Sequence, residues 1–359
     1  MSSLNRNDRV KLYITQQLDK AETKSEKDFT NLPNYDEVSE ILDDLIKTKV
    51  MGFRGIVATA LTGLFLNPNY DPLNNFYACN PRSIFENGIF FAFQNRVPCG
   101  KSDPLNVAKN QNELDTNWAK GKRPESAALA VVKFLTLIAN NPNQKNILTD
   151  FYFYRLIDFS NSIRLVRTIL PASHKIPQQV TAHRLVEFVY DYPESGTTPQ
   201  LLVSLLLKRL YQHSSLVIVG GEESVFGTNT TSKKPADIWI EEKGKPINLY
   251  EITVKKIDIK RLDDSFSSLD AMHMLDANIH FICRLPQDVS ALKDLTDNTY
   301  IYNGKSFNFI DLRSFILTSV ALLTPVQLDC LMLDLVKFIA DIQRPMKTKE
   351  GWNNIFERT

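Results

Sequence analysis

Two acidic residues in the second half of the chain lie on consecutive segments whose composition is typical of β-strands. Asp237 opens the apolar run 237–240, and Glu251 lies within the run 249–252. A polar stretch that contains Gly and Pro, residues 241–246, separates the two runs. The sequence therefore predicts a β-hairpin that carries one carboxylate on each arm.

Further polar residues follow Glu251 with the spacing of a strand. Strand side chains alternate between faces, so Glu251, Thr253 and Lys255 are expected on one face and the apolar residues between them on the other. Two carboxylates and an ammonium on neighbouring strands would form a site for a hard divalent cation and an activated water. The alternative is an ordinary solvated hairpin face, because antiparallel sheets often face water on one side.

The apolar pattern around the hairpin predicts the elements that position it. Residues 197–211 are rich in Leu and predict a buried helix, and residues 216–219 predict a short buried strand. After the hairpin, residues 259–269 have apolar side chains at three- and four-residue steps, which is typical of an amphipathic helix. Residues 278–283 predict another strand, so the order is helix, strand, hairpin, helix, strand.

This order, with Asp237 shortly after Pro235 and Glu251 on the next strand, resembles the PD-(D/E)xK nuclease superfamily over about residues 197–285. Within the superfamily, the layout resembles a type II restriction endonuclease. The resemblance implies an α/β fold with a restriction-endonuclease-like core, a mixed sheet flanked by helices. It also implies that Asp237 and Glu251 bind Mg²⁺ and take part in catalysis.

The chain departs from the superfamily pattern at the third motif position. Thr253 stands where the superfamily usually has lysine, and Ala236 is inserted in the first half of the motif. Lys255, two residues further along the expected strand face, could supply the missing ammonium. The resemblance then implies that Lys255, helped by Thr253, orients the attacking water and offsets charge in the transition state.

Segments of the N-terminal half are similar to segments of the SacI-like restriction endonucleases. These segments are residues 54–63, 71–74, 80–84 and 100–106. They fall largely within a stretch rich in Asn, Pro and Gly, residues 67–124, which predicts long loops. A long loop-rich stretch in a globular domain is more often functional than idle.

Basic residues near this stretch and near the hairpin are candidates for DNA binding. Lysines could pair with phosphates and Arg123 with a guanine edge, whereas a solvated basic turn is the alternative for the dense run 118–124. Two lysines just before Asp237 could hold the scissile backbone. The predicted DNA-binding residues are Lys101, Lys120, Lys122, Arg123, Lys233 and Lys234. Around the hairpin, basic residues outnumber acidic ones, which suits a polyanion; they are Lys243, Lys245, Lys255, Lys256, Lys260 and Arg261.

Composition limits the class of protein. The chain has 359 residues, of which 43% are hydrophobic and 23% charged, as expected for a soluble globular protein of two or three domains. The formal net charge is +1, so a nucleic-acid surface has to be local. The four cysteines lack metal-ligand spacing, and neither a signal peptide nor a membrane span is apparent. The expected location is the cytoplasm.

Three regions are expected along the chain. Residues 1–175 would form a helical and loop-rich DNA-recognition region, residues 176–290 the PD-(D/E)xK catalytic core, and residues 291–359 a C-terminal helical extension packed on the core. Within the last region, residues 299–302 and 307–309 predict a short strand pair.

The sequence favours a type II restriction endonuclease that hydrolyses double-stranded DNA at a short site with Mg²⁺. Cutting both strands would suit a homodimer, since site symmetry mirrors protein symmetry, and a cognate DNA methyltransferase would be its genetic partner. Two alternatives remain: a structure-specific or repair nuclease with the same site, and a catalytically inactive nuclease-like DNA-binding module, which Thr253 in place of lysine keeps open.

Overall fold

The computed structural model describes residues 5–171, 176–221 and 234–358 of the chain. The chain divides into two compact units. The first, here called the helical unit, comprises residues 1–167 and 341–346, and the second, the sheet unit, comprises residues 168–340 and 347–359. Each unit has a hydrophobic core of its own.

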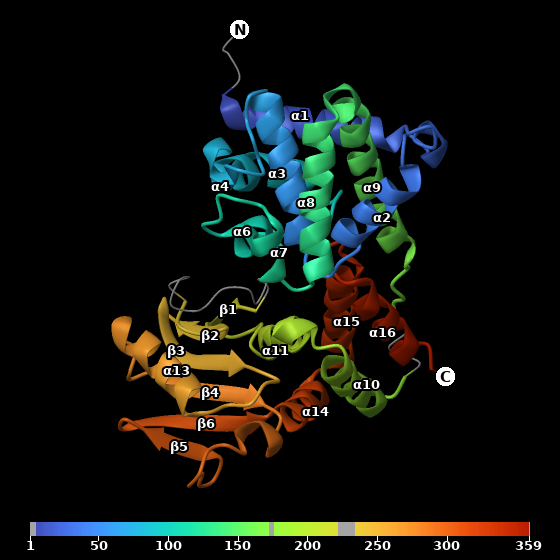
Figure 1. Cartoon of the computed structure of the whole chain (residues 1–359). Coiled ribbons are helices and arrows are strands. Elements are labelled where there is room, and N and C mark those ends of the chain that lie inside the picture. The colour runs from blue at the N-terminus through green and yellow to red at the C-terminus, as the bar shows by residue number, and fades with distance from the viewer. Residues whose placement is uncertain (1–4, 172–175, 222–233, 359) are drawn as a thin grey trace. The chain divides into compact units, whose positions relative to one another are not determined.

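The helical unit is built of helices packed around one apolar helix. That helix, α3 (Gly52–Leu66), is buried from Gly52 to Gly63, because its sequence there is apolar or small apart from Arg54, which donates hydrogen bonds to the Pro98 and Thr48 carbonyls. It contacts the helices α1, α2, α4, α6 and α8, several of which can be followed in Figure 1. The other helices of this unit are α1 (Arg6–Glu22), α2 (Tyr35–Ile46), α4 (Pro81–Ile84), α5 (Phe90–Phe93), α6 (Asp103–Ala108), α7 (Thr116–Lys120), α8 (Glu125–Asn140) and α9 (Lys145–Leu165), with shorter turns at Glu26–Asp28, Phe76–Cys79, Phe85–Ile89 and Pro142–Gln144.

The stretch 67–124, expected to be loop-rich, contains the short helices α4 to α7 joined by loops. Asparagines account for several of the breaks between them. Asn80, Asn95 and Asn110 have φ of 54°, 60° and 57°, a left-handed conformation that asparagine adopts more readily than most residues. The high Asn content therefore shortens the helices here without leaving the chain irregular throughout.

The sheet unit contains a six-stranded mixed sheet in the order β1-β2-β3-β4-β6-β5 (Figure 1). The inner strands β3, β4 and β6 are parallel, whereas β1 and β2, β2 and β3, and β5 and β6 pair antiparallel. The strands are β1 (Val217–Gly220), β2 (Ile238–Glu242), β3 (Lys245–Ile252), β4 (Asn278–Cys283), β5 (Thr299–Tyr302) and β6 (Lys305–Asp311).

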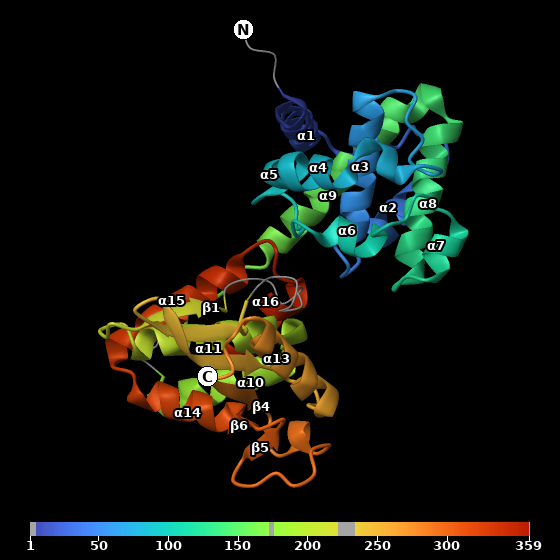
Figure 2. The same cartoon turned by 90° about the vertical axis from the view of Figure 1, so that its left-hand side faces the viewer.

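Helices cover both faces of this sheet, as Figures 1 and 2 show. On one face, Ile238, Tyr250 and Ile252 belong to a core that most of the unit's helices complete. On the other face, Leu262 and Leu269 of α13 pack with Leu249 and Phe281. The helices are α10 (Gln178–Asp191), α11 (Thr197–Leu210), α13 (Ile259–Ala271), α14 (Leu312–Leu322), α15 (Pro325–Ala340) and α16 (Met346–Phe356), with short turns at Glu194–Gly196 and Gln287–Val289.

The predicted order of helix, strand, hairpin, helix and strand is confirmed as α11, β1, β2–β3, α13 and β4. The expectation of a helical extension over residues 291–359 is wrong in one respect. The predicted strand pair is present, and its second strand, β6, lies inside the sheet between β4 and β5. Phe307 and Phe309 are buried there with Phe281, so hydrophobic burial joins this segment to the sheet.

No helix within the described ranges 5–171, 176–221 and 234–358 combines the length and hydropathy needed to cross a membrane.

Candidate active site

The hairpin between β2 and β3 closes through a two-residue turn. Lys243 and Gly244 have φ of 52° and 76°, as a type I′ turn requires at both central positions. The strands therefore extend further into the polar stretch 241–246 than its composition predicts, with β2 ending at Glu242 and β3 beginning at Lys245. The turn fixes the pairing of the residues nearest to it.

A bulge in this hairpin decides which residues face each other at its far end. Next to the turn, Glu242 pairs with Lys245 and Glu241 with Pro246, but beyond that point Ile240 pairs with Asn248. Ile247 is thus the extra residue of a β-bulge, a position where a neighbouring proline is tolerated. The shifted register then pairs Ile238 with Tyr250.

The bulge brings the two candidate acids to the same face of the sheet. Continuing the register by one residue beyond the pair of Ile238 and Tyr250 sets Asp237 opposite Glu251. In an unbulged pairing of the same residues, Ile247 would pair with Ile240 and Asp237 would lie opposite Tyr250, whose side chain points to the other face from Glu251, because a one-residue slip exchanges the faces of a strand. The juxtaposition of the two carboxylates thus depends on Ile247 being left out of the pairing.

Asp237 lies just before β2 and is held by the backbone of β3. Its Oδ2 accepts a hydrogen bond of 2.9 Å from the Ile252 amide. Burial raises the pKa of the Asp237 carboxyl above its ordinary value, while the Ile252 amide and the charges of Arg261 and Lys234 act to lower this pKa. Asp237 therefore lies in a partly desolvated position that both basic side chains influence.

Glu251 is the most buried acidic group of the site. Only 2% of its side chain is exposed, and its Oε2 accepts a hydrogen bond of 2.7 Å from Nη2 of Arg261 on α13. Arg261 itself is 45% exposed. Asp258 forms the N-cap of α13 by accepting a hydrogen bond from the Arg261 amide at 2.9 Å. The start of α13 is thereby fixed beside the end of β3.

The prediction that Thr253 and Lys255 continue the strand face is wrong, because β3 ends at Ile252. The Thr253 amide still donates to Ile282 on β4, but the chain then bends, and Lys255 is exposed. The Thr253 hydroxyl accepts a hydrogen bond of 3.1 Å from the Lys255 amide, a local turn that competes with strand pairing. Lys255 therefore lies in a loop and not on the strand.

That loop is anchored by an ion pair at the end of β4. Arg284 donates to Asp288 at 2.8 Å and to the Val254 carbonyl, and the Asp288 carbonyl accepts from the Ile257 amide at 2.7 Å. Asp288 is only 2% exposed, and its hydrogen bond raises the pKa of the Arg284 guanidinium. The backbone on either side of Lys255 is therefore held in place.

The acid pair fits a Mg²⁺ ion better than an ion that requires many protein ligands. Within the described part of the chain, no three Asp, Glu, His or Cys side chains are arranged to hold a metal together. Mg²⁺ is usually bound by one or two carboxylates, with water and substrate phosphate oxygens completing its octahedron. Asp237 and Glu251 supply two hard oxygen donors on one face of the sheet, which meets that requirement.

The remaining predicted DNA-binding residues belong mostly to the helical unit. Lys101, Lys120 and Arg123 are exposed, and Lys122 is partly exposed. Nζ of Lys122 lies 5.8 Å from the centre of the Trp118 ring, and Arg123 donates to the Lys122 carbonyl at 2.8 Å. Lys234 lies in the sheet unit, where its charge acts on Asp237. Lys233 lies outside the described residues.

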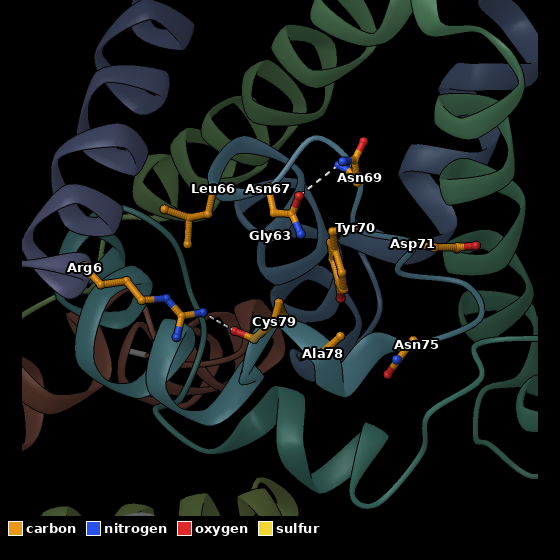
Figure 3. Close-up of a pocket in the computed structure, with 10 residues that line it drawn as sticks. All are labelled: Arg6, Gly63, Leu66, Asn67, Asn69, Tyr70, Asp71, Asn75, Ala78 and Cys79. Atoms are coloured by element: carbon orange, nitrogen blue, oxygen red, sulfur yellow. Dashed lines mark hydrogen bonds between the residues drawn. The ribbon is translucent and has the colours of Figure 1, made fainter.

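A pocket of about 440 Å³ opens in the helical unit (Figure 3). Most of its lining comes from the asparagine-rich stretch that begins at Asn67. Arg6 reaches it from α1 and donates a hydrogen bond to the Cys79 carbonyl. The lining residues are Arg6, Gly63, Leu66, Asn67, Asn69, Tyr70, Asp71, Asn75, Ala78 and Cys79. The pocket carries a single acidic group and lies in a different unit from the acid pair.

No protein-family model matches this sequence, and no match is found among curated proteins.

Proposed function

We propose that the protein is a Mg²⁺-dependent endonuclease that hydrolyses double-stranded DNA, and that it acts as a type II restriction enzyme with a PD-(D/E)xK core. The observation that carries this proposal is the bulged register of the hairpin, which sets Asp237 opposite Glu251 on one face. The bulge supports it because unbulged pairing of the same residues would put the two carboxylates on opposite sides of the sheet.

The surrounding elements support the same proposal. The order α11, β1, β2, β3, α13 and β4 agrees with the core that the motif resemblance implies. β3 and β4 are parallel, with α13 as the connection between them on one face. The acid pair thus lies at the start of β2 and the carboxyl end of β3, a kind of location where open α/β sheets often bind ligands.

In the proposed reaction, each residue has a separate role. Asp237 and Glu251 would hold Mg²⁺, which, when bound, polarises a phosphoryl oxygen and lowers the pKa of a water molecule. The Ile252 amide keeps the Asp237 carboxylate oriented. Lys255 would orient the attacking water from its anchored loop, and Lys234 would pair with a phosphate of the scissile strand.

Recognition would belong to the helical unit. Its exposed residues Lys101, Lys120 and Arg123, with Lys122, would contact DNA through phosphates or base edges. We propose a homodimer as the active form and a cognate methyltransferase as the genetic partner, because both strands of a short site have to be cut by the enzyme and the host's own copies protected.

A second candidate function is a nuclease-like DNA-binding module without catalysis. It is favoured by the ion pair between Glu251 and Arg261 and by the position of Lys255 outside the strand. In that case the carboxylates would be a structural remnant and Arg261 their permanent counter-ion.

Digestion of unmethylated phage DNA separates these candidates. We expect discrete bands with MgCl₂ and none with EDTA. Discrete bands in both conditions would contradict the proposed metal dependence, and a smear or cleavage only at branched substrates would favour a structure-specific nuclease. Retarded but uncut DNA in a mobility-shift assay would favour the inactive module.

A further inference from the structure

Arg261 is in direct contact with the acid pair, although the motif assigns it no role. Its Nη2 lies 2.7 Å from Oε2 of Glu251, and its charge also acts on Asp237. One guanidinium therefore contacts Glu251 and also acts electrostatically on Asp237, the two carboxylates that the proposed function assigns to Mg²⁺. The position follows from the fold, because Arg261 lies in the first turn of α13, directly after the loop that leaves β3.

The contact has a clear electrostatic reason. Glu251 is only 2% exposed, and an ionised carboxylate that is buried without a counter-charge is costly. Arg261 supplies that charge with a hydrogen bond, while 45% of its own side chain remains exposed to solvent. A long, half-exposed side chain can move away into water at little cost, so this counter-ion is replaceable.

We propose that Arg261 is the resident counter-cation of the acid pair and that a divalent cation must displace it from Glu251 in order to bind. This inference rests on the proposed function, because it takes Asp237 and Glu251 to be the ligands. At equal distance a divalent ion attracts a given carboxylate about twice as strongly as a guanidinium does. The dehydration of Mg²⁺ offsets part of that advantage, so the two cations compete.

The displaced guanidinium has a second use in the same reaction. It would remain tethered at the start of α13, whose backbone is fixed by the Asp258 cap, close to where a phosphate meets the ion. Arginine matches the geometry of phosphate oxygens. Arg261 would therefore exchange a carboxylate for a phosphate when DNA and metal bind together, which makes it a positioning residue.

Thermal unfolding measured across titrations with MgCl₂ and CaCl₂, without DNA, tests the competition. The set is the wild type, Arg261→Ala, Arg261→Lys, the neighbouring exposed control Lys260→Ala, and Glu251→Gln. In EDTA, Arg261→Ala should unfold at a lower temperature, because Glu251 loses its ion pair with Arg261. When cation is added, the unfolding temperature of Arg261→Ala should rise more than that of the wild type. The rise should reach half of its maximum at a cation concentration that is lower by about fivefold or more. Lys260→Ala should follow the wild type, and Arg261→Lys should lie between.

The outcomes separate this inference from the proposed function. In one outcome, the wild type and Arg261→Ala reach half of the maximal rise in unfolding temperature at the same cation concentration, while Glu251→Gln abolishes the rise. That result would overturn the competition between Arg261 and the cation but would leave the metal site supported. No cation response in any variant, Arg261→Ala included, would overturn both. If Arg261→Ala fails to fold, isothermal titration calorimetry of Arg261→Lys and Arg261→Gln with CaCl₂ gives the same comparison. We expect Arg261→Gln to bind Ca²⁺ more tightly than Arg261→Lys does. Equal affinities would contradict the proposal.

Discussion

At the scale of single residues, the site consists of two carboxylates in different surroundings. Glu251 is fully buried and paired with Arg261, whereas Asp237 is partly exposed and held by a backbone amide. Burial raises the pKa of Asp237, so this carboxyl holds its proton more tightly in the folded chain than in the unfolded chain. A cation bound beside Asp237 would therefore be favourable, because it would compensate the negative charge of the ionised carboxylate.

Asp237→Asn should become more stable than the wild type as the pH rises, when both are compared in EDTA. An acid whose folded-state pKa is raised contributes stability fully only below its ordinary pKa, and this contribution is lost as the pH rises through the folded-state pKa. The difference in unfolding temperature should therefore grow in favour of Asp237→Asn between pH 4 and pH 7. Asp264→Asn, an exposed carboxyl on α13, is the control for net charge. A difference that shrinks with rising pH would contradict this assignment.

Lys255→Ala should lower the single-turnover rate of DNA cleavage about a hundredfold or more, as expected for loss of a positioned electrostatic stabiliser. Arg284 anchors the loop that carries Lys255 by donating to the Val254 carbonyl. The backbone position of Lys255 is therefore fixed, although the residue lies outside the strand. The exposed neighbour Lys256→Ala is the matched control. Normal cleavage by Lys255→Ala together with a slow Lys256→Ala would assign the role to the neighbour.

The sequence predicts the two acids but not the cation that meets them. Asp237 and Glu251 are predictable because each lies in an apolar run of strand type. Arg261 stands out only as one of several basic residues near the hairpin, since nothing in its spacing relative to Glu251 reveals a contact across a loop and a helix start. The sequence pattern predicts Thr253 and Lys255 on the strand because alternation alone does not show where pairing ends.

At the scale of elements, the hairpin and α13 form the site together. The turn at Lys243 and Gly244 and the extra residue Ile247 set the register, and the Asp258 cap fixes the start of α13. The strands and helices themselves were predictable from apolar periodicity. The bulge was not, because a single extra residue does not alter the composition of a strand.

Insertion of one alanine after Ile247 should separate the two carboxylates while leaving the hairpin able to form. With a one-residue bulge, the inserted alanine would pair with Ile240, so Asp237 would lie opposite Tyr250 and point away from Glu251. We expect the stabilisation by MgCl₂ in thermal unfolding and the cleavage of DNA both to be lost. Ile247→Ala keeps the residue count and should retain the response to MgCl₂. Full cleavage by the insertion variant would show that the register does not position the acids.

At the scale of the whole molecule, the proposed function assigns chemistry and recognition to different units. The acid pair lies in the sheet unit, and the exposed basic residues near α7 lie in the helical unit. The first segment of the helical unit ends at residue 167, and the expected role of residues 1–175 in DNA recognition stays a prediction. The return of residues 341–346 to the helical unit could not be predicted, because contacts between distant segments leave no local pattern in the sequence.

Arg123→Ala and Lys122→Ala should affect DNA binding in different ways. Arg123 is exposed and extends from the turn after α7, so loss of a base contact should cost about 1–3 kcal/mol and relax preference at one position of the site. Lys122→Ala should weaken all sequences alike and reduce the slope of log K against log[salt] by about one. Titrations at several salt concentrations on specific and unrelated duplexes measure both effects. Unchanged DNA affinity in both variants would indicate that residues 118–124 are an ordinary solvated basic turn.

The central claim is that Asp237 and Glu251 together bind the ion that cleavage requires. Its most direct test is the rate of Mg²⁺-dependent cleavage by Asp237→Ala and Glu251→Gln, measured beside DNA affinity in EDTA, with Glu241→Gln on the same hairpin as the matched acidic control. We predict that both site variants lose cleavage and still bind DNA with largely unchanged affinity, because phosphate contacts elsewhere supply most of the binding energy. Glu241→Gln should cut normally. Cleavage by Asp237→Ala at a rate near that of the wild type would contradict the claim.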